Sequence, residues 1–445
     1  MSTDDKDHSN SGADRAFGFA TRAVHAAAVP DPVTGARATP IHQSTSFVFD
    51  SAEHASSLFN LQTFGNVYSR IGNPTVAVFE ERMAALENGR AALACASGMA
   101  AQMTALLAIL KAGDHIVAAS TLYGGTVGQL GVGFARLGIE TTFVDPSRPE
   151  DFAAAMRPET RAVFGETIGN PLVNVLDIAS MAEVAHAHGV PLIIDNTVAS
   201  PYLCNPCELG ADIVLHSATK YIGGHGTSIG GVIVDSGKFR WNNGKFPEFT
   251  EPDPSYHGIQ YWDALGNVPG MGNVAFILKV RLTLLRDLGA ALSPFNAHEL
   301  LLGLETLPLR QKRHSENALA LAQWLRKHPR VSWVTYPGLE DDPGHALASM
   351  YLKQGYGGLV GFGLKGGLEA GKTFINNVKL LSHLANIGDA KTLVIHPAST
   401  THQQLTEEEQ RETGVTADYI RLSVGLEDLA DLQADIDQAL QKTES

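Results

Sequence analysis

Four polar residues stand where apolar runs end in the middle of the chain. Asp195 lies near the end of PLIIDNT, and Ser217, Thr219 and Lys220 follow one another in LHSATKYIGGHG. A partly desolvated lysine at a strand end can have the lowered pKa with which an amine attacks an aldehyde. An aspartate one crossover earlier can face a pyridine nitrogen and keep it protonated. We expect Ser217 and Thr219 to alternate on the strand toward a phosphate, with Lys220 pointing to the other side.

Together these residue types match the aldehyde, the ring nitrogen and the phosphate of pyridoxal 5′-phosphate (PLP). Taken singly, Lys220 is more simply a solvated surface lysine and Asp195 a helix cap, as most such residues are. Their combination at strand ends, with a phosphate site between them, favours a PLP enzyme in which Lys220 forms a Schiff base with the cofactor.

A second candidate is the helix start at 96–100, ASGMA, which follows a short apolar run. Free N–H groups and the positive end of the helix dipole can bind an anion there, and Gly98 lets a phosphate approach the backbone. A plain tight turn fits the same residues. A dinucleotide site at 96–101 and 222–226 is a further interpretation, which the lack of G-x-G-x-x-G after the first strand disfavours.

Two further side chains suit the same site. Tyr123 in TLYGGT follows an expected strand and could stack on a pyridine ring, although a half-buried structural tyrosine fits equally well. Arg421 in DYIRLSVGLE is a lone arginine among apolar neighbours, which is costly unless the side chain is paired. A substrate carboxylate bound bidentately or an internal salt bridge would each satisfy it.

The elements that must position these residues follow from the apolar pattern. From Tyr68 onward, short β-branched runs alternate with longer amphipathic stretches, which predicts a parallel sheet with crossover helices on both faces. Ligands of such sheets bind beyond the carboxyl ends of the strands. The expected strands are 115–120, 141–145, 162–167, 191–197, 212–217 and 230–235, and the expected helices are 75–88, 98–111 and 178–188, the last capped by Gly189.

Three other segments stand outside this alternation. The stretch 246–272, rich in proline and aromatic residues, is expected to be an insertion or a lid. A long helical region from about 273 to 328 should lead into a smaller C-terminal α/β domain that ends in a helix at 427–442. Residues 1–17 are polar and are expected to be disordered, because they have little to bury.

The composition limits the class of protein. With 445 residues, 44% of them apolar, the chain can fill two domain cores, and its net charge of −14 argues against nucleic acid or an anionic membrane as partner. No secretory signal or membrane span is evident, so a cytoplasmic location is expected by default. Cys204 and Cys207 form a C-x-x-C, for which a plain loop is favoured over a redox role, and no metal site is expected.

Ordered motifs run through most of the chain: VYSRIGNPT, ASGMAA, LYGGT, ETIGNP, IIDNT, HSATKYIGGHG, GLETLPLRQKRHSENA and HPASTTH. With these motifs the chain resembles the Cys/Met-metabolism family of PLP enzymes from Ala20 to Gln441. The resemblance implies a fold-type I PLP-dependent transferase, with a mostly parallel seven-stranded sheet between helices and a smaller C-terminal α/β domain. Two departures are the missing proline after the threonine of ETIGNP and Val127 in place of a common aromatic residue.

The resemblance also implies roles at the cofactor. Lys220 would hold PLP covalently and act as the base, Asp195 would pair with the ring nitrogen, and Tyr123 would stack on the ring and assist proton transfer. Asn170 would lie near the phenolic oxygen. The residues implied to hold the phosphate from within the chain are Gly98 and Met99, through their amides, and Ser217 and Thr219, through their hydroxyls.

Other implied roles concern the substrate and a neighbouring subunit. Arg421 and Asn170 would bind the substrate carboxylate, and the turn that begins at Asn386 would line the substrate pocket. Tyr68 and Arg70 would reach the phosphate from a neighbouring subunit, with Tyr68 also close to the substrate. The protein would therefore be at least a dimer, and the family is usually tetrameric.

Within the family, the insertion at 246–272 and the run at 385–405 are most similar to members that act on O-acetyl-L-homoserine. These imply γ-replacement with sulfide or methanethiol, giving homocysteine or methionine and acetate. Sulfhydrylation of O-succinylhomoserine, cystathionine γ-synthesis and methionine γ-lysis remain alternatives on the same fold. The expected domain plan is a tail at 1–17, an N-terminal arm for subunit contacts at 18–72, a PLP-binding domain at 73–305 and a C-terminal domain at 306–445.

Overall fold

The computed structural model describes residues 17–401, 403 and 414–443. The disorder expected for residues 1–17 therefore lies outside the described residues except at Phe17, which is exposed. The last motif residue, His402, and the stretch 404–413 also lie outside them. Among the helices of the described residues, none has the length and apolar run that crossing a bilayer requires.

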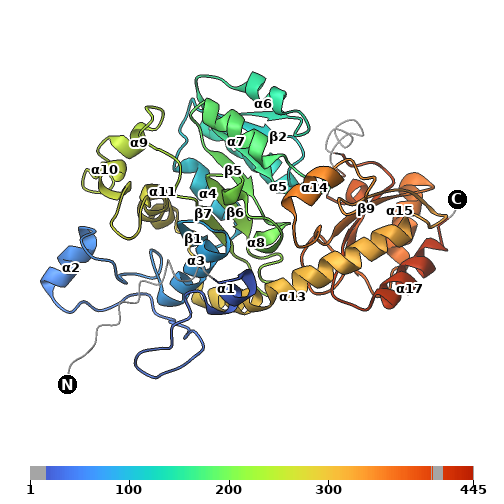
Figure 1. Ribbon diagram of the computed structural model, residues 1–445, viewed down its shortest axis with the longest axis horizontal. Coiled ribbons are helices and arrows are strands. Elements are labelled where there is room, and N and C mark those ends of the chain that lie inside the picture. Colours follow the sequence, from blue (N-terminus) through green and yellow to red (C-terminus); the bar gives the residue numbers. More distant parts are fainter. Residues whose placement is uncertain (1–16, 402, 404–413, 444–445) are drawn as a thin grey trace.

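A seven-stranded sheet forms the centre of the larger domain (Figure 1). Its strand order is β1-β7-β6-β5-β4-β2-β3, and all neighbours are parallel except β7, which runs antiparallel to both β1 and β6. The mostly parallel sheet and its six predicted strands are confirmed. The strands are β1 Ala91–Cys95, β2 His115–Ala119, β3 Glu140–Val144, β4 Thr160–Glu166, β5 Leu192–Asp195, β6 Ile213–Ser217 and β7 Gly231–Asp235.

Helices cover this sheet, and three of them begin at side-chain caps. Asn73 accepts a hydrogen bond from the Thr75 amide at the start of α3, and Ser97 accepts one from Ala100 at the start of α4. The third predicted helix ends as expected, because Gly189 takes a positive φ of 66° just beyond it. The helices of this layer are α3 Pro74–Leu86, α4 Gly98–Leu107, α5 Gly124–Gly128, α6 Pro149–Ala155, α7 Ile178–Ala187 and α8 Ser200–Leu203.

The helical region expected at 273–328 is interrupted, so the expectation of one long stretch is wrong in its middle. Gly289 adopts a φ of 73° and ends the first part, and Pro294 begins the second as its first helical residue. The first part is α11 Ala275–Lys279, a π-helical segment Val280–Leu285 and α12 Arg286–Leu288, and the second is the single helix α13 Pro294–Leu325.

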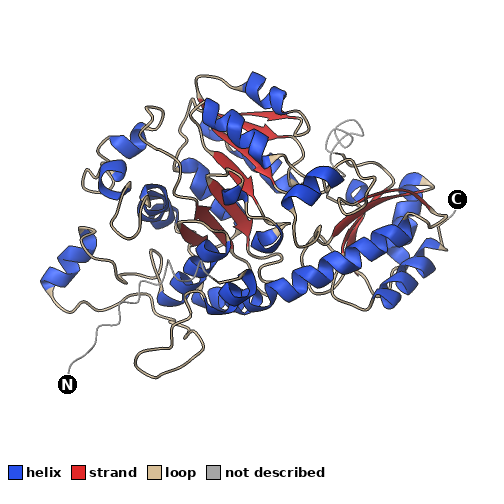
Figure 2. Ribbon diagram, viewed as in Figure 1, coloured by secondary structure: helices blue, strands red, loops and turns tan. Residues whose placement is uncertain are grey.

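The helix α13 runs from the large sheet to a second, smaller sheet (Figures 1 and 2). The second sheet has the order β10-β11-β12-β9-β8 and its own apolar core, which confirms the smaller C-terminal domain. The boundary expected between residues 305 and 306 falls inside α13 and stays a prediction. The elements are β8 Val331–Thr335, α14 His345–Tyr351, β9 Leu359–Leu364, α15 Gly367–Asn377, β10 Ser382–His383, β11 Leu393–Ile395, β12 Tyr419–Ser423 and α17 Leu429–Leu440.

The segment 246–272 packs as an outlying layer beside α11 (Figure 1). Trp241 stacks on Phe249 and on Phe276, with ring centroids 4.4 and 5.2 Å apart, so the segment is fastened by its aromatic side chains. Its helices are α9 Pro247–Thr250 and α10 Tyr261–Leu265. Within the described residues it makes no hydrogen bond to the site residues below, which favours an insertion over a lid.

The N-terminal residues extend from the body of the molecule (Figure 1). They contain α1 Phe19–His25, which packs on α13, and α2 Ala52–Phe59. Apolar side chains along this stretch are open to solvent in the single chain, with Val48 95% and Phe64 60% exposed. We refer to residues 18–72 as the arm.

Candidate active site

Polar side chains at the carboxyl ends of β4, β5 and β6 form two rows, one on each face of the sheet. Glu166 and Asp195 are register partners in the parallel ladder. Because side chains alternate across a strand, Glu166 and Asp195 project from one face, while Thr167 and Asn196 project from the other, together with His216 of β6. The first row meets the loops that carry the other predicted site residues, and the second row is closed inside the domain.

Lys220 lies in the turn after β6 and reaches across to the C-terminal domain. Its Nζ donates to Oδ1 of Asn386 over 2.5 Å. Burial, followed by the nearby charge of Arg421, lowers the pKa of the Lys220 amine. A lysine with such a pKa is a better nucleophile and base near neutral pH than an exposed one.

The approach of the two domains at Lys220 is close. The Cβ of a residue other than glycine at 388 would lie 2.6 Å from the Tyr221 amide nitrogen and 3.0 Å from the carbonyl carbon of Lys220. Gly388 also has a φ of 73°, and its amide donates to Ser423 Oγ over 2.9 Å. The turn after Asn386 is therefore held directly against the lysine.

Arg421 projects from β12 toward the same place. Its Nη1 donates to Asn170 Oδ1 over 2.7 Å and its Nη2 to the Asn386 carbonyl over 3.1 Å. The Arg421 Nε is buried without a partner in the described part of the chain, and no carboxylate there forms an ion pair with the guanidinium. The internal salt bridge that competed with a substrate carboxylate is thus not formed among the described residues.

Tyr123 caps the short helix α5 just after the loop that follows β2. Its amide donates to Glu166 Oε1 over 2.7 Å, and its side chain is half exposed. A Cβ at Gly125 would lie 2.4 Å from the Tyr123 ring, so the glycine lets the ring lie against the backbone. One face of the phenol is left available for a ligand.

Asp195 ends β5 beside Glu166. Its Oδ1 accepts the Thr197 amide over 2.9 Å. Burial raises the pKa of Asp195, while the Thr197 hydrogen bonds and the nearby His216 oppose that rise. Burial and the charge of Asp195 raise the pKa of Glu166 well above its usual range.

The start of α4 and the end of β6 form one concave surface. A Cβ at Gly98 would lie 2.7 Å from the Ser217 Cβ, so only glycine permits this approach. Ser97 caps the third amide of the helix, which leaves the Gly98 and Met99 amides at the open N-terminus. Amides at a helix start beside a hydroxyl suit a phosphate.

The expectation that Ser217 and Thr219 alternate on one strand is wrong. The strand ends at Ser217, and Thr219 lies in the following turn. The Thr219 hydroxyl donates to the Gly230 carbonyl over 3.2 Å and accepts the Gly230 amide over 3.1 Å. The hydroxyl closes the turn onto β7 because Gly230 precedes that strand.

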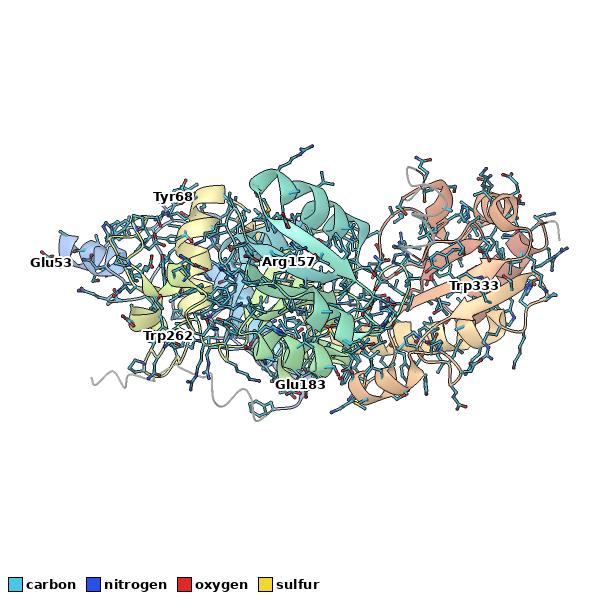
Figure 3. All side chains as sticks on the ribbon, turned by 90° about the horizontal axis from the view of Figure 1, so that it is seen from above. Glu53, Tyr68, Arg157, Glu183, Trp262 and Trp333 are labelled. Carbon is cyan, nitrogen blue, oxygen red and sulfur yellow. The ribbon has the colours of Figure 1, made fainter. Side chains whose placement is uncertain are left out.

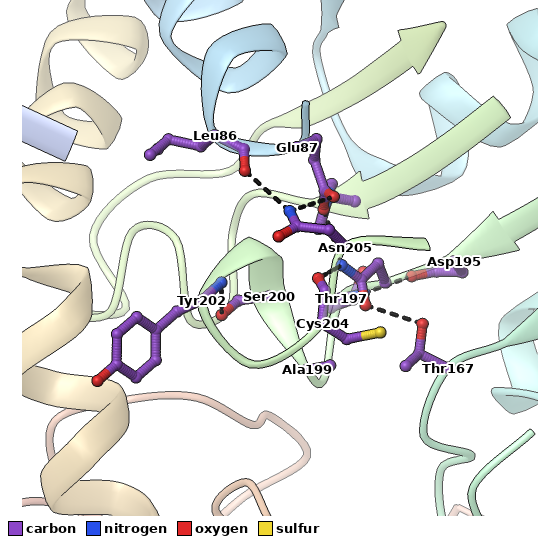
Figure 4. Close-up of polar contacts among 12 residues, drawn as sticks. Leu86, Glu87, Thr167, Asp195, Thr197, Ala199, Ser200, Tyr202, Cys204 and Asn205 are labelled. Carbon is purple, nitrogen blue, oxygen red and sulfur yellow. Dashed lines mark hydrogen bonds and ion pairs between the residues drawn. The ribbon is translucent and has the colours of Figure 1, made fainter. Parts of the chain in front are cut away.

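The second row forms a buried network on the other face (Figure 4). Glu87, at the end of α3, accepts from His216 Nε2 over 2.6 Å and from Asn196 Nδ2 over 2.7 Å, and neither Glu87 nor His216 has an exposed side chain. Asn205 donates to the second Glu87 oxygen over 3.2 Å, and Thr167 donates to Asn196 Oδ1 over 2.8 Å. The network joins the ends of β4, β5 and β6.

Arg310 of α13 binds the backbone of the turn that carries Lys220. Its guanidinium donates to the carbonyls of Tyr221 over 2.7 Å, Ile222 over 3.1 Å and Gly303 over 2.7 Å. A Cβ at Gly224 would lie 2.1 Å from the same guanidinium. The turn that carries Lys220 is therefore bound to the long helix by backbone carbonyls.

Tyr68 and Arg70 are not brought to this site within one chain. Arg70 donates to the Arg286 carbonyl, and its guanidinium lies over the Tyr68 ring at 5.3 Å. Figure 3 places Tyr68 toward the opposite end of the molecule from Trp333 of the C-terminal domain. Among the described residues, neither side chain forms a hydrogen bond with the site residues above.

The C-x-x-C pair does not have the features of a redox site. Cys204 and Cys207 are free and buried. Burial raises the pKa of both thiols, which disfavours the reactive thiolate. The two cysteines are packing residues of the loop beneath Asn196.

Comparisons with known proteins place the chain in a family. Residues 20–441 match the model of the family described as Cys/Met metabolism PLP-dependent enzyme. The chain belongs to this family. Its fold-type I architecture and its dependence on PLP follow from that membership and from the two sheets described above.

Named relatives match over nearly their whole length. The chain is 56% identical to O-acetyl-L-homoserine sulfhydrylase of Leptospira meyeri, over 96% of this chain and 97% of that protein. It is 53% identical to homocysteine synthase of Schizosaccharomyces pombe, with 95% and 98% covered. A crystal structure of an O-acetylhomoserine (thiol)-lyase from Campylobacter jejuni, 39% identical, superposes with a TM-score of 0.91 over 96% of this chain and 100% of that one, and carries a pyridoxyl-lysine phosphate.

The residues present fit PLP. The cradle at Gly98 and Ser217 would be filled by any larger side chain at 98. The exposed Tyr123 ring and the Arg421 Nε, which has no partner among the described residues, leave a stacking and a polar group for ligands. Lys220 and Asp195 lie near the same edge, as an aldehyde and a pyridine nitrogen require. When bound, PLP supplies an electron-withdrawing ring conjugated to the amino acid.

Sequence reasoning missed Glu166, Glu87, Asn196 and His216. Three of these stand inside motifs that were noted, ETIGNP, IIDNT and HSATKY, but were given no role. For Glu166 a signal was present, because a carboxylate that directly ends the apolar run AVFG must be buried or paired. Glu87 had no such signal, since its partners lie more than a hundred residues further along the chain.

Proposed function

We propose that this enzyme replaces the acetoxy group on Cγ of O-acetyl-L-homoserine with sulfur. Sulfide gives homocysteine and methanethiol gives methionine, each with acetate as the other product. Relatives at 56% and 52% identity that are named O-acetyl-L-homoserine sulfhydrylase, from Leptospira meyeri and Thermus thermophilus, support this substrate. O-succinylhomoserine sulfhydrylation, cystathionine γ-synthesis and methionine γ-lysis are the less supported alternatives.

One observation carries the proposal: Lys220 and Arg421 meet at Asn386. The Asn386 side chain accepts from Lys220 and its carbonyl accepts from Arg421, so a base and a carboxylate-binding group share one anchor. An amino acid whose α-carboxylate binds Arg421 and Asn170 has its Cα presented toward the lysine. This is the arrangement that removal of a Cα proton requires.

The cofactor roles follow from the same positions. Lys220 would hold PLP covalently, Asp195 would pair with the ring nitrogen, and Tyr123 would stack on the ring. Asn170 lies near the phenolic oxygen. The phosphate would be held by the amides of Gly98 and Met99 and the hydroxyl of Ser217, and by the hydroxyl of Thr219 once it turns from the Gly230 carbonyl toward the phosphate.

In the reaction, Lys220 handles the protons. Its free amine takes the proton from Cα, and a second proton passes from Cβ to a base of the site as acetate departs from Cγ with the bonding electron pair. Hydrosulfide or methanethiolate then forms the new C–S bond at Cγ. Both protons return, to Cβ and to Cα, after sulfur has bonded to Cγ. Tyr123 assists these transfers with its phenol, and Tyr68 from a neighbouring subunit is the second candidate.

The assignment of Lys220 is tested by Lys220→Ala. The visible absorption band of the lysine-bound cofactor is expected to disappear, and sulfhydrylation to fall at least about a hundredfold. Lys238→Ala is the matched control, because Lys238 binds the Cys207 carbonyl away from the site. A band that persists in Lys220→Ala would overturn the assignment.

The leaving group is tested by giving the purified enzyme O-acetyl- and O-succinyl-homoserine, each with sulfide. Homocysteine from the acetyl ester supports the proposal, and product from the succinyl ester alone would overturn it. Cysteine in place of sulfide tests cystathionine synthesis, and methionine given alone tests γ-lysis through the release of methanethiol.

We also propose a homotetramer built from dimers that share active sites, in which the arm supplies Tyr68 and Arg70 to the phosphate of a neighbour. The exposed apolar side chains of the arm support this arrangement. Mixing Lys220→Ala with Arg70→Ala subunits tests it, because hybrid dimers regain one intact site. Absence of any recovered activity would contradict shared sites. The cytoplasmic location stays a prediction.

A further inference from the structure

We propose that Glu166 is a positioning residue that works as a neutral carboxylic acid, holding the Tyr123 and Asn170 segments at the cofactor site and leaving the negative charge on Asp195. The inference rests on the proposed roles of these three neighbours. It assigns a function to a side chain that contacts neither the proposed base nor the substrate carboxylate directly.

The first step is the placement of two carboxyl groups. Glu166 ends β4 and Asp195 ends β5 as its register partner, so the two side chains leave the same face of adjacent strands. Strands in a sheet lie about 4.8 Å apart, Glu166 is buried, and Asp195 is half-buried at the end of its strand. Within the described residues neither forms an ion pair. Ionisation of both carboxyl groups is disfavoured in this arrangement, so we infer that the pair keeps one proton.

The second step decides which residue keeps that proton. Asp195 is the better anion, because Thr197 donates to it and His216 stabilises its charge. Among the described residues, Glu166 has only two backbone donors, and its burial and the charge of Asp195 raise its pKa well above the usual range. The proton therefore stays on Glu166. The other titratable groups around the site are Tyr123, His216, Lys220 and Arg421, and Asp195 is the one whose charge acts on Glu166.

The third step is what the neutral carboxyl group holds. Its Oε1 accepts the Tyr123 amide over 2.7 Å, and its Oε2 accepts the Asn170 amide over 3.3 Å. Asn170 in turn accepts from Arg421 over 2.7 Å. One side chain thus ties the loop that carries the ring-stacking tyrosine to the loop that orients the carboxylate-binding arginine.

The protonation is tested by difference infrared spectra of the holoenzyme at neutral pH, comparing the parent with Glu166→Gln. Loss of a protonated-carboxyl C=O band in the variant is expected. A difference spectrum is needed because burial raises the pKa of Asp235 to about 7, so Asp235 contributes a protonated-carboxyl band of its own. Glu183→Gln, on the exposed surface of α7, is the matched control (Figure 3). No band difference at Glu166 would overturn the proposal.

The positioning is tested by the dissociation constant of PLP. Glu166→Gln keeps a neutral group of the same shape, but only its carbonyl oxygen can accept one of the two backbone amides, so PLP binding is expected to weaken by about threefold. Glu166→Ala leaves both amides without an acceptor and is expected to weaken binding about tenfold or more. Should the alanine variant not fold, Glu166→Asp withdraws the same acceptors. Equal losses in the glutamine variant and in the alanine or aspartate variant would overturn the neutral acid.

Neither measurement depends on turnover. If the enzyme fails to use O-acetyl-L-homoserine, the infrared band and the PLP affinities still decide the state of Glu166. If Glu166 proves ionised, the substrate assignment is unaffected, because it rests on Lys220 and Arg421.

Discussion

Two glutamates are buried on opposite faces of the large sheet, and their surroundings differ. Glu87 meets an imidazole and two side-chain amides, from His216, Asn196 and Asn205. Glu166 meets two backbone amides and a second carboxyl group, Asp195. The first set of neighbours stabilises a charge, and the second favours the neutral acid. Glutamate therefore joins strand ends in two ways. Glu87 does so as one member of a polar pair, and Glu166 does so as a protonated acid.

The largest expected effect comes from breaking the buried pair of Glu87 and His216. His216→Leu leaves Glu87 buried with amide donors alone, and the free energy of unfolding is expected to fall by about 3 kcal/mol. Urea unfolding of the purified enzyme measures it. Arg326→Leu is the control, since it breaks an ion pair whose partners are 43% and 63% exposed, and it should cost no more than about 1 kcal/mol. Equal losses would remove the contrast between buried and exposed pairs.

A smaller effect separates the two glutamates directly. At neutral pH, Glu87→Gln removes the anionic partner of His216 and is expected to cost about 2 kcal/mol of unfolding free energy. Glu166→Gln loses the acceptor of one backbone amide but also removes the group whose raised pKa lowers the stability of the parent at neutral pH, so it is expected to cost less than Glu87→Gln. Thermal unfolding of the two variants beside the parent checks this, and a larger loss at Glu166 than at Glu87 would reverse the comparison.

The pH dependence of the stability of Glu166→Gln tests whether Glu166 is the neutral acid of the comparison. Folding raises the pKa of Glu166 above its ordinary 4.5, so above that pH the folded protein keeps a proton that the unfolded chain releases. The parent therefore loses stability as the pH rises from 4.5 to the raised pKa, and the glutamine variant does not. The variant should gain on the parent by up to about 1.4 kcal/mol per pH unit in this window. Urea midpoints from about pH 5 to about pH 8 measure the gain, and a constant difference would show that Glu166 does not hold the proton.

The smallest expected effect concerns the hydrogen bond from Thr167 to Asn196 in the Glu87 network. Thr167→Val keeps the side-chain shape but removes the donor to Asn196 Oδ1, at a cost of about 1 kcal/mol. The same unfolding measurement applies. A cost as large as that of His216→Leu would mean that Thr167, and not the imidazole, fixes the network.

The parts of the fold that depend on short runs could be predicted from the sequence. The strands at 115–120 and 212–217 are apolar runs bounded by polar or glycine residues, and they lie within one residue of β2 and β6. The strand β1 was missed because AALAC is rich in alanine and has no β-branched residue. The antiparallel direction of β7 was not predictable, since it depends on a connection and not on composition.

The site residues also divide into those that a local sequence signal predicts and those that depend on contacts between distant segments. Lys220, Asp195 and Gly98 stand beside local signals, a strand end or a helix start, and were found. The pairing of Glu166 with Asp195 depends on the register of two strands, and that of Glu87 with His216 on contacts between residues 129 positions apart. Thr219 was placed on a strand because alternation was extended beyond Ser217, where the turn toward Gly230 begins.

The clamp formed by Arg310 has a consequence for recombining this enzyme with its relatives. The lysine turn and the long helix form one unit, because three backbone carbonyls of 221, 222 and 303 depend on one guanidinium. A chimera that joins two parents at residues 305 and 306 would divide α13 between them and separate Arg310 from the carbonyls it was selected to bind. A crossover in the loop 289–293, before the helix begins, keeps α13 whole and leaves the Arg310 contacts to 221 and 222 as the junction to be matched.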